Sequence, residues 1–506
     1  MKSSTSLDRL LARLEACKRQ FGTPEQRDLP RLLETLGGRR FPDARSLIRF
    51  HEALLFFRAY PANARVARLT EELLDSFAER VDRLRRSDGD LTPFEEPDVS
   101  GIAGTAFSAI FSYDIARWLA VRHAREVELD WDATDPALLG PLLSGLNPMF
   151  AEDALVEANI PFRDWFRATK RGRGSDLRWL TATAERLQLA PALFDHARLA
   201  IRWELGNSPA TRTRLRLARP GRTFYHNRAL LRRSDISLAS ELQSPPLALE
   251  KLSPAQGQNM LDLFRSTSAM RYRELHGFTY GDASRMVRAD LGRGVEVYIC
   301  GVPANHRLPL RAYHAGMYFK NAVPIGYIEC LSFFDRIEVG FNLYYTFREG
   351  ETAWLYARLL RVFRQMLGVS SFAVDPYQLG LHNEEAIESG AFWFYRKLGF
   401  RPANARVAKL LESEEARLRA DPSHRTPAAI LRRLSAGWML YEMPRTRPGD
   451  WDNFEIRRVA MAVPRPPFPA PIERAKRAPL ESSYLRLLQH HPQLRKTMIR
   501  LGSRQP

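Results

Sequence analysis

Between Arg336 and Gly368 the hydrophobic period of the sequence changes from two residues to three or four. The stretch "RIEVGFNLYYTFR" alternates, which predicts a strand. The turn "REGETA" leads into "ETAWLYARLLRVFRQMLG", whose apolar residues recur at helical spacing and whose Gly368 predicts a helix end. The expected polar face of the strand comprises Glu338, Gly340, Asn342, Tyr344, Thr346 and Arg348. This part of the chain is therefore expected to mix strands and helices.

The neighbouring sequence extends this mixed pattern. "AGMYFKNAVPIGYIECLSFF" predicts a hairpin of strands 315–319 and 325–334. "VSSFAVDPY" predicts a further strand, 389–398 a second helix and "GWMLYEMP" a late strand. The order is hairpin, strand, helix, strand, helix, strand, which indicates an α+β domain over residues 247–444.

A chain of 506 residues is too long for one hydrophobic core, so more than one domain is expected. Residues 1–197 have a helical pattern and predict a helical domain of unknown role. A basic connecting region, 198–246, ends at Pro245 and Pro246. After the mixed domain, residues 445–506 contain the proline-rich linker "VPRPPFPAP" and predict a basic helical tail.

Composition narrows the class of protein. Hydrophobic residues at 45% and charged residues at 26% are typical of a soluble globular protein, and no apolar run reaches the roughly 20 residues that span a bilayer. The beginning lacks a secretory apolar segment, so a cytoplasmic protein is expected. Cys17, Cys300 and Cys330 are too few and too widely separated for a disulfide framework or a four-cysteine zinc site. No metal is expected.

The formal net charge of +18 favours encounters with anions such as nucleic acid, acidic lipid or a phosphorylated cofactor. The cluster "KRGRG" at 170–174 could contact nucleic acid, but the sequence contains no recognised nucleic-acid-binding motif. We therefore interpret the charge mainly as composition bias, with nucleic acid as a minor alternative partner.

The stretch "FYRKLGF" at the end of the second helix resembles the Tyr-x-x-x-Gly-Phe signature of the GNAT superfamily of N-acetyltransferases. The resemblance covers residues 247–444 and includes the order of elements. It implies a GNAT-like mixed β-sheet flanked by helices after the helical N-terminal domain, and acetyl-CoA or another acyl-CoA as donor.

The family's pyrophosphate turn is Arg or Gln, two residues, Gly, one residue, then Gly or Ala. In "REGETA" Arg348 and Ala353 match its ends, but Glu351 occupies the expected glycine position and Gly350 lies one residue early. A carboxylate there would repel a pyrophosphate unless it turned away or paired with an arginine; alternatively it is an ordinary acidic helix start. The resemblance implies donor contacts at Asn342, Arg348, Gly350, Thr352, Ala353 and Asn383.

Two of these assignments have local alternatives. Asn383 precedes Tyr395 by 395 − 383 = 12 residues, further than the family's usual spacing, so "LHNEEAIESG" is either an insertion or a segment in which Asn383 caps a helix. Asp375 in "DPYQLG" either contacts substrate or belongs to a turn that ends a strand.

Tyr395 matches the family tyrosine that protonates the departing CoA thiolate, a role that suits a phenol with a pKa of about 10. Its alternative is a core aromatic. An acceptor amine with a pKa of about 10.4 needs a base to remove its proton. Glu338 is the first candidate and Glu329, which could also contact substrate, is the second; either could instead pair with an arginine.

The sequence therefore predicts an acyl-CoA-dependent N-acyltransferase that acts by direct attack of a small-molecule or protein amine. Two alternatives stay open: a transferase of related fold that uses aminoacyl-tRNA, and a catalytically degenerate GNAT-like binding module. Fold resemblance alone does not separate them.

Overall fold

The computed structural model describes residues 2–150, 152, 160–218, 222–444, 449, 451–452, 454–461 and 496. The chain divides into two compact units. The first comprises Met1–Ala229, Asn259–Thr279 and Asn321–Pro324, and the second comprises Leu230–Gln258, Tyr280–Lys320 and Ile325–Pro506.

The first unit begins with a bundle of helices built around α3. Asp43 starts this helix by accepting a hydrogen bond from the Ser46 amide at 2.7 Å. Phe50, Phe56 and Phe57 of α3 are fully buried, so this helix forms the centre of the bundle. The helices are α1 (Lys2–Cys17), α2 (Leu29–Gly37), α3 (Ala44–Ala59), α4 (Ala64–Asp75) and α5 (Phe77–Arg85).

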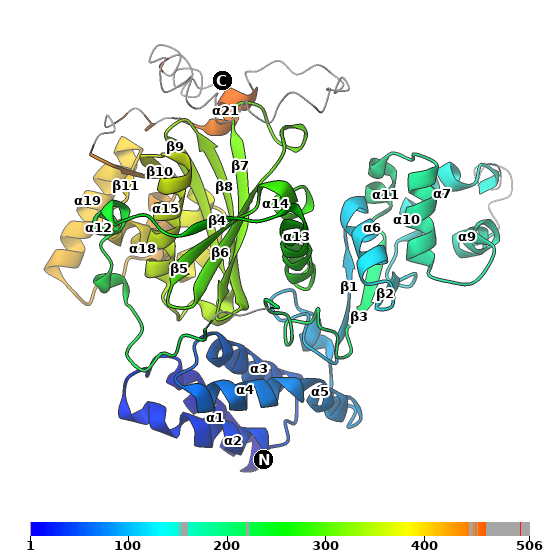
Figure 1. The fold of residues 1–506 in the computed structure, drawn as a ribbon, viewed down its shortest axis with the longest axis horizontal. Helices are drawn as coiled ribbons and strands as arrows, with labels where there is room; N and C mark the ends of the chain where they lie inside the picture. Colours follow the sequence, from blue (N-terminus) through cyan, green and yellow to red (C-terminus); the bar gives the residue numbers. More distant parts are fainter. Residues whose placement is uncertain are drawn as a thin grey trace. The chain divides into compact units, whose positions relative to one another are not determined.

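A small antiparallel sheet follows in the same unit, with strand order β1-β3-β2 (Figure 1). Its strands are β1 (Ala106–Ile110), β2 (Val127–Leu129) and β3 (Ala200–Glu204). The sequence predicts a helical pattern up to residue 197, so β1 and β2 were missed. Strands of five and three residues show too few alternations to reveal a period of two. The accompanying helices are α6 (Tyr113–Arg122), α7 (Gly140–Leu146), α9 (Phe162–Lys170), α10 (Asp176–Arg186), α11 (Pro191–Ala197) and α14 (His276–Thr279), together with α13 (Pro254–Ala269) from Asn259 onward.

The second unit contains a nine-stranded mixed sheet with the order β11-β12-β10-β9-β8-β7-β6-β5-β4 (Figure 1). β9 and β10 pair in parallel, and the other described pairings are antiparallel. The strands are β4 (Leu249–Lys251), β5 (Val287–Gly292), β6 (Val295–Gly301), β7 (Ala312–Lys320), β8 (Val323–Phe333), β9 (Arg336–Leu343), β10 (Ser371–Val374), β11 (Arg401–Pro402) and β12 (Met439–Glu442). The expected combination of a mixed sheet with helices is confirmed.

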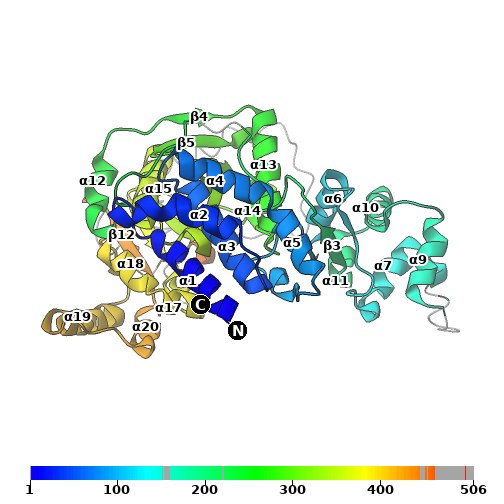
Figure 2. The ribbon, with the colours of Figure 1, turned by 90° about the horizontal axis from the view of Figure 1, so that it is seen from below.

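Helices accompany this sheet, and Figure 2 shows α17, α19 and α20 close together beside α18. Gly368 ends α15 in the left-handed conformation, with φ of 69°, as its position in the sequence predicts. The helices are α12 (Leu238–Gln243), α15 (Thr352–Leu367), α16 (Pro376–Leu379), α17 (Glu384–Glu388), α18 (Ala391–Lys397), α19 (Ala405–Ala420), α20 (Ala428–Leu434) and α21 (Ile456–Met461).

Two details of the sequence prediction are wrong. β9 ends at Leu343 rather than Arg348, because its ladder with β8 ends at the pair Gly326–Leu343 and a 3-10 turn forms over Tyr345–Phe347. The helical spacing of Arg358, Arg361 and Arg364 predicts that they line the outer face of α15. Arg361 is instead buried and forms an ion pair with Glu241 at 2.6 Å.

The expected proline-rich linker and the basic tail lie outside the described residues, apart from the single residue Lys496. Within the described ranges, no helix is long and apolar enough to cross a membrane.

Candidate functional site

The parallel strands β9 and β10 are paired over only part of their length. Ser371, Phe372 and Ala373 of β10 pair with Arg336, Ile337 and Glu338 of β9. β10 ends one residue later, whereas β9 continues from Val339 to Leu343. In the described structure the two strands therefore part after Glu338, and the backbone of β9 beyond this point has no ladder on its β10 side.

From Val339 to Leu343 the two faces of β9 differ as the alternation predicts, whereas Glu338, Tyr344 and Thr346 of the expected polar face are buried. Val339, Phe341 and Leu343 are buried, whereas Gly340 and Asn342 are partly exposed. The Phe341 ring packs edge-on against Tyr356 of α15 with ring centroids 5.2 Å apart, so α15 covers the face of Phe341. Since alternate side chains point to opposite faces, Glu338 lies on the other face of the sheet.

Glu338 is buried at the point where the strands part. Its Oε1 accepts a hydrogen bond from Nη1 of Arg336 at 3.0 Å, so the arginine partner that the sequence left open is present. Burial raises the pKa of the Glu338 carboxyl, Arg336 opposes that rise, and the nearby Asp375 adds to it. The Arg336 guanidinium lies against three aromatic rings, those of Trp438, Trp451 and Phe454.

The other two predicted carboxylates have local partners. Glu329 lies opposite Gly340 on the face of Glu338 and accepts a hydrogen bond from the Tyr313 hydroxyl. Asp375 accepts a hydrogen bond from the Tyr377 amide at 2.8 Å and caps α16, as its strand-ending alternative describes.

Glu351, the residue in the expected glycine position of the turn, is only 1% exposed. Its carboxylate accepts hydrogen bonds from the Arg293 guanidinium and, at 3.1 Å, from the Leu231 amide. Lys320 lies 4.0 Å away, and burial lowers the pKa of this lysine to about 7. The negative charge at this position is therefore paired with an arginine and buried.

The remaining residues of the turn lie around the beginning of α15. The Arg348 side chain is 44% exposed and pairs with Glu385. The Gly350 amide donates to the Phe347 carbonyl at 3.0 Å, and Thr352 Oγ1 donates to the Arg348 carbonyl at 3.1 Å. Glu351, the N-cap residue of α15, makes no side-chain hydrogen bond to the first turn of the helix. The first-turn amides, including that of the buried Ala353, therefore keep a partial positive charge.

The two predicted asparagines have different positions. Asn342 is partly exposed on the face of β9 that carries Glu338. Asn383 caps α17: its Oδ1 accepts a hydrogen bond from the Ala386 amide at 3.2 Å, and its amide group donates to the Tyr377 carbonyl at 3.1 Å. Both polar atoms of the Asn383 side chain are therefore hydrogen-bonded within its own turn.

Tyr395 belongs to α18 and is 4% exposed. Its ring packs edge-on against Tyr356, with centroids 5.4 Å apart, which places Tyr395 on the helix-covered face of the sheet. Burial raises the pKa of its phenol. Among the described residues its hydroxyl has no hydrogen-bond partner. Tyr395 and Glu338 therefore lie on opposite faces of the sheet.

Sequence reasoning missed Arg293, Lys320 and Arg336. The position of Glu351 indicates that an arginine is needed, but Arg293 is 58 residues away in the chain. Arg336 precedes Glu338 by two residues on the same face of the expected strand. That spacing was the available signal for the Arg336–Glu338 pair.

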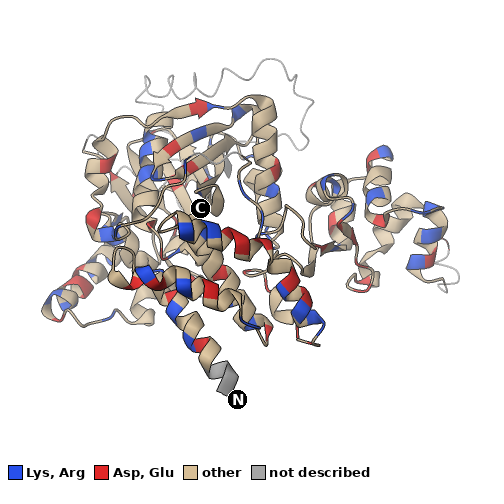
Figure 3. Ribbon diagram, turned by 60° about the horizontal axis from the view of Figure 1, so that its bottom comes forward, with Lys and Arg blue, Asp and Glu red and all other residues tan. Residues whose placement is uncertain are grey.

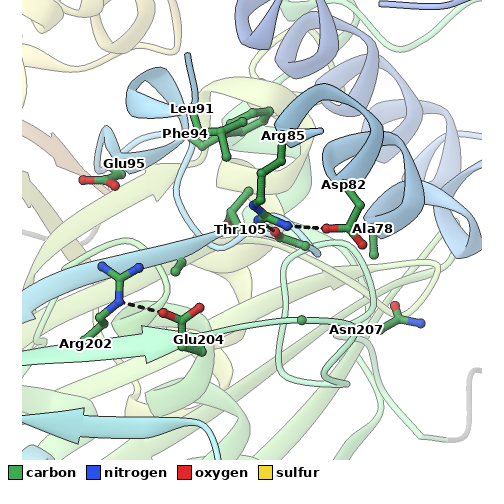
Figure 4. A pocket seen from close by; sticks show the side chains of 13 residues that line it. Ala78, Asp82, Arg85, Leu91, Phe94, Glu95, Thr105, Arg202, Glu204 and Asn207 are labelled. Carbon is green, nitrogen blue, oxygen red and sulfur yellow. Dashed lines mark hydrogen bonds and ion pairs between the residues drawn. The ribbon is translucent and has the colours of Figure 1, made fainter. Parts of the chain in front are cut away.

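A cavity in the first unit is lined mainly by residues of α5, β1 and β3 and their flanking loops, and has a volume of about 370 Å³ (Figure 4). Arg85 pairs with Asp82 there, and Arg202 pairs with Glu204 at 2.6 Å. Its charged side chains thus pair largely with one another. The residues predicted from the sequence lie in the second unit instead.

Basic and acidic residues are interspersed on the helices of both units (Figure 3). Many form exposed ion pairs, such as that between Arg432 and Glu384 at 2.7 Å. Such pairs contribute about 0–1 kcal/mol each. The arginine excess is therefore distributed over many sites.

Within the described ranges, no group of three or more His, Cys, Asp or Glu side chains could hold a metal ion. A comparison of the chain with protein-family models, with curated proteins and with solved structures found no match.

Proposed function

We propose that this protein is an acyl-CoA-dependent N-acyltransferase that moves an acyl group, with acetyl as the first candidate, from CoA to an amine. The observation that carries the proposal is the end of the parallel pairing of β9 with β10 at Glu338, in the strand that leads through a 3-10 turn to the N-terminus of α15. Crevices outside the carboxyl ends of parallel strands are a common location of ligand sites.

The order of elements supports a GNAT-like arrangement of the second unit. β7, β8 and β9 are consecutive in the sheet, β10 lies beside β9 after the helix α15, and β12 follows β10 in the sheet. Tyr395 of "FYRKLGF", the stretch that resembles the family signature, belongs to α18, which follows β10 after the short helices α16 and α17.

The turn 348–353 can bind the pyrophosphate of the donor. The first amides of a 16-residue helix attract anions, and the exposed Arg348 lies beside them. Glu351 does not oppose this role, because its carboxylate is paired with Arg293. The pairing with Arg293 answers the objection that a charged carboxylate at this position would repel the pyrophosphate.

Glu338 and Tyr395 suit the two proton transfers of the reaction. When the amine attacks the thioester carbonyl, a carbon–nitrogen bond forms and the carbon–sulfur bond breaks. Glu338 accepts the proton that the amine loses, and the raised pKa of its buried carboxyl suits that task. Tyr395 donates a proton to the departing sulfur from the other face of the sheet. Holding the amine and the thioester together supplies much of the rate.

Calorimetric titration with acetyl-CoA and longer acyl-CoAs tests the proposal. Arg348→Ala should weaken binding by about 10- to 100-fold, since a hydrogen bond to a charged group is worth about 1.5–3 kcal/mol. Arg432→Ala is a matched control, because Arg432 is similarly exposed and pairs with Glu384, next to the partner of Arg348. It should leave affinity unchanged.

Folded protein that binds no acyl-CoA would contradict the proposal. That result would favour aminoacyl-tRNA as the donor, or a role as a binding module.

A further inference from the structure

Three tyrosines from different elements meet on the helix-covered face of the second unit's sheet: Tyr318 of β7, Tyr356 of α15 and Tyr395 of α18. Tyr318 and Tyr356 are fully buried. The Tyr356 ring lies 5.4 Å from that of Tyr395, and both Tyr318 and Tyr356 pack edge-on against Phe341, at 5.7 Å and 5.2 Å. We call these three residues the tyrosine cluster.

The hydroxyls of Tyr318 and Tyr356 have no hydrogen-bond partner among the described residues, and neither does that of Tyr395. A buried hydroxyl without a partner costs free energy, and nearly all such groups in folded proteins are satisfied. One unpaired hydroxyl is an ordinary exception. Two in one cluster, beside the hydroxyl of Tyr395, indicate a shared partner from outside the chain.

The hydroxyls also lie close enough to influence one another. Burial raises the pKa of Tyr356 well above its ordinary value, and the negative charge that Tyr395, Cys330 or Tyr318 carries when deprotonated raises it further. Burial likewise raises the pKa of Tyr318. All three phenols therefore stay protonated at neutral pH and can act as donors.

The tyrosine cluster adjoins the place where the strands part. Phe341, which touches both Tyr318 and Tyr356, lies in the section of β9 beyond its last pairing with β10 at Glu338. Under the proposed function, the thioester end of the donor lies in this opening. On the proposed function, hydroxyl donors at this opening lie near the thioester group of the donor and far from its pyrophosphate.

We propose that Tyr318 and Tyr356, together with Tyr395, form a donor subsite that hydrogen-bonds the thioester group of the bound acyl donor. This inference rests on the proposed function and deepens it, because it assigns two binding residues beyond the signature tyrosine. A thioester offers a carbonyl oxygen and a sulfur as acceptors, whereas free CoA offers only the sulfur. Acetyl-CoA therefore uses more of the subsite than CoA does.

Phenylalanine variants separate a ligand-binding hydroxyl from a structural one. Tyr318→Phe and Tyr356→Phe should leave the urea midpoint of the free protein unchanged or higher, because each removes an unpaired buried hydroxyl. Tyr298→Phe is the control: its hydroxyl donates to Glu296 at 3.3 Å in the same sheet, so its loss should lower the midpoint. A lowered midpoint in the two cluster variants would mean that their hydroxyls have partners within the chain, and would overturn the proposal.

The second measurement is calorimetric titration of the same variants with acetyl-CoA and with CoA. Each cluster variant should bind acetyl-CoA about tenfold more weakly, because one hydrogen bond contributes about that much to affinity. The loss of affinity for CoA should be smaller. Tyr298→Phe should bind both like the wild type. If the wild type binds acetyl-CoA and both cluster variants bind it with the same affinity, this inference is overturned and the proposed function is left intact. Folded wild type that binds neither ligand overturns both.

Discussion

The two units contain buried polar clusters that differ in one respect. In the first unit, His51, Glu52, Arg212 and Thr213 are buried around α3, and each has partners within the chain. In the second unit, the hydroxyls of the tyrosine cluster have none among the described residues. Burial is similar in both, so hydrogen-bond pairing rather than burial separates a structural network from a candidate ligand site.

The network of the first unit contains a carboxylate, an imidazole and a hydroxyl in hydrogen-bonded sequence, as a catalytic triad does, but its hydroxyl is buried and already bonded. His51 Nδ1 lies 3.1 Å from Glu52 Oε1, and His51 Nε2 lies 3.0 Å from Thr213 Oγ1. The Thr213 oxygen also accepts the Ala103 amide at 2.9 Å, and Arg212 binds both oxygens of Glu52 at 3.0 Å. A hydroxyl that is 1% exposed and already an acceptor is a structural group rather than a nucleophile.

The largest effect is expected from breaking the paired network. Glu52→Ala leaves the buried Arg212 without its carboxylate and should lower the free energy of unfolding by about 3–5 kcal/mol, measured by urea unfolding. Glu15→Ala, which breaks a half-exposed pair with Arg49 in the same unit, should cost below about 1 kcal/mol. Equal losses in the two variants would show that the buried network is no more important than a surface pair.

Tyr395→Phe should lower the reaction rate without lowering stability, whereas Glu52→Ala lowers stability. Tyr395→Phe removes a proton donor from the proposed reaction and should slow CoA release by about 100-fold in an assay with an amine acceptor. The free energy of unfolding should not fall, because the hydroxyl has no partner within the described chain. A variant that unfolds more easily but retains its rate would assign Tyr395 to the core.

Thr213→Val and Tyr356→Phe compare the loss of a single paired hydroxyl with the loss of a single unpaired one. The first substitution leaves the buried Ala103 amide without its acceptor, so the free energy of unfolding should fall by about 1–3 kcal/mol. Tyr356→Phe also removes a single buried hydroxyl but should cost nothing. Similar losses from both substitutions would remove the distinction between the two clusters.

The smallest expected effect is a pH dependence of stability. Burial lowers the pKa of His51 below its ordinary 6.5; Glu52 opposes this shift, and Arg212 and Arg58 add to it. As the pH falls through about 6.5, the unfolded chain gains a proton that the folded chain resists. Stability is therefore present above this pH and lost below it, by at most about 1.4 kcal/mol per pH unit. The slope should decrease in His51→Gln; an identical slope would assign it to other groups.

Local sequence signals predict the elements that position the candidate site. The alternation of β9 and the helical stripe of α15 each extend over enough residues to establish a period, and Gly368 marks the end of α15. The short strands β1 and β2 gave no such signal. Beyond Leu343, alternating aromatics suggested a longer strand, but the chain leaves the ladder there because tertiary pairing decides where a strand ends.

The chemistry of the site depends on contacts that no local pattern encodes. The sequence indicates that Glu351 needs a cationic partner, but only the fold brings the hairpin residue Arg293 to it. Tyr356 occupies a position where an aromatic residue would ordinarily be interpreted as core. Whether its hydroxyl is paired depends on β7 and α18, which are distant in the chain.

Amide hydrogen exchange with and without acetyl-CoA tests the central claim most directly, because it locates the ligand as well as detecting it. Bound acetyl-CoA should slow exchange at Val339–Leu343 of β9, in the first turn of α15 and in α18, and leave the amides around His51 and Thr213 unchanged. Slower exchange confined to the first unit, or unchanged exchange throughout the second, would contradict the assignment of the site to the opening between β9 and β10.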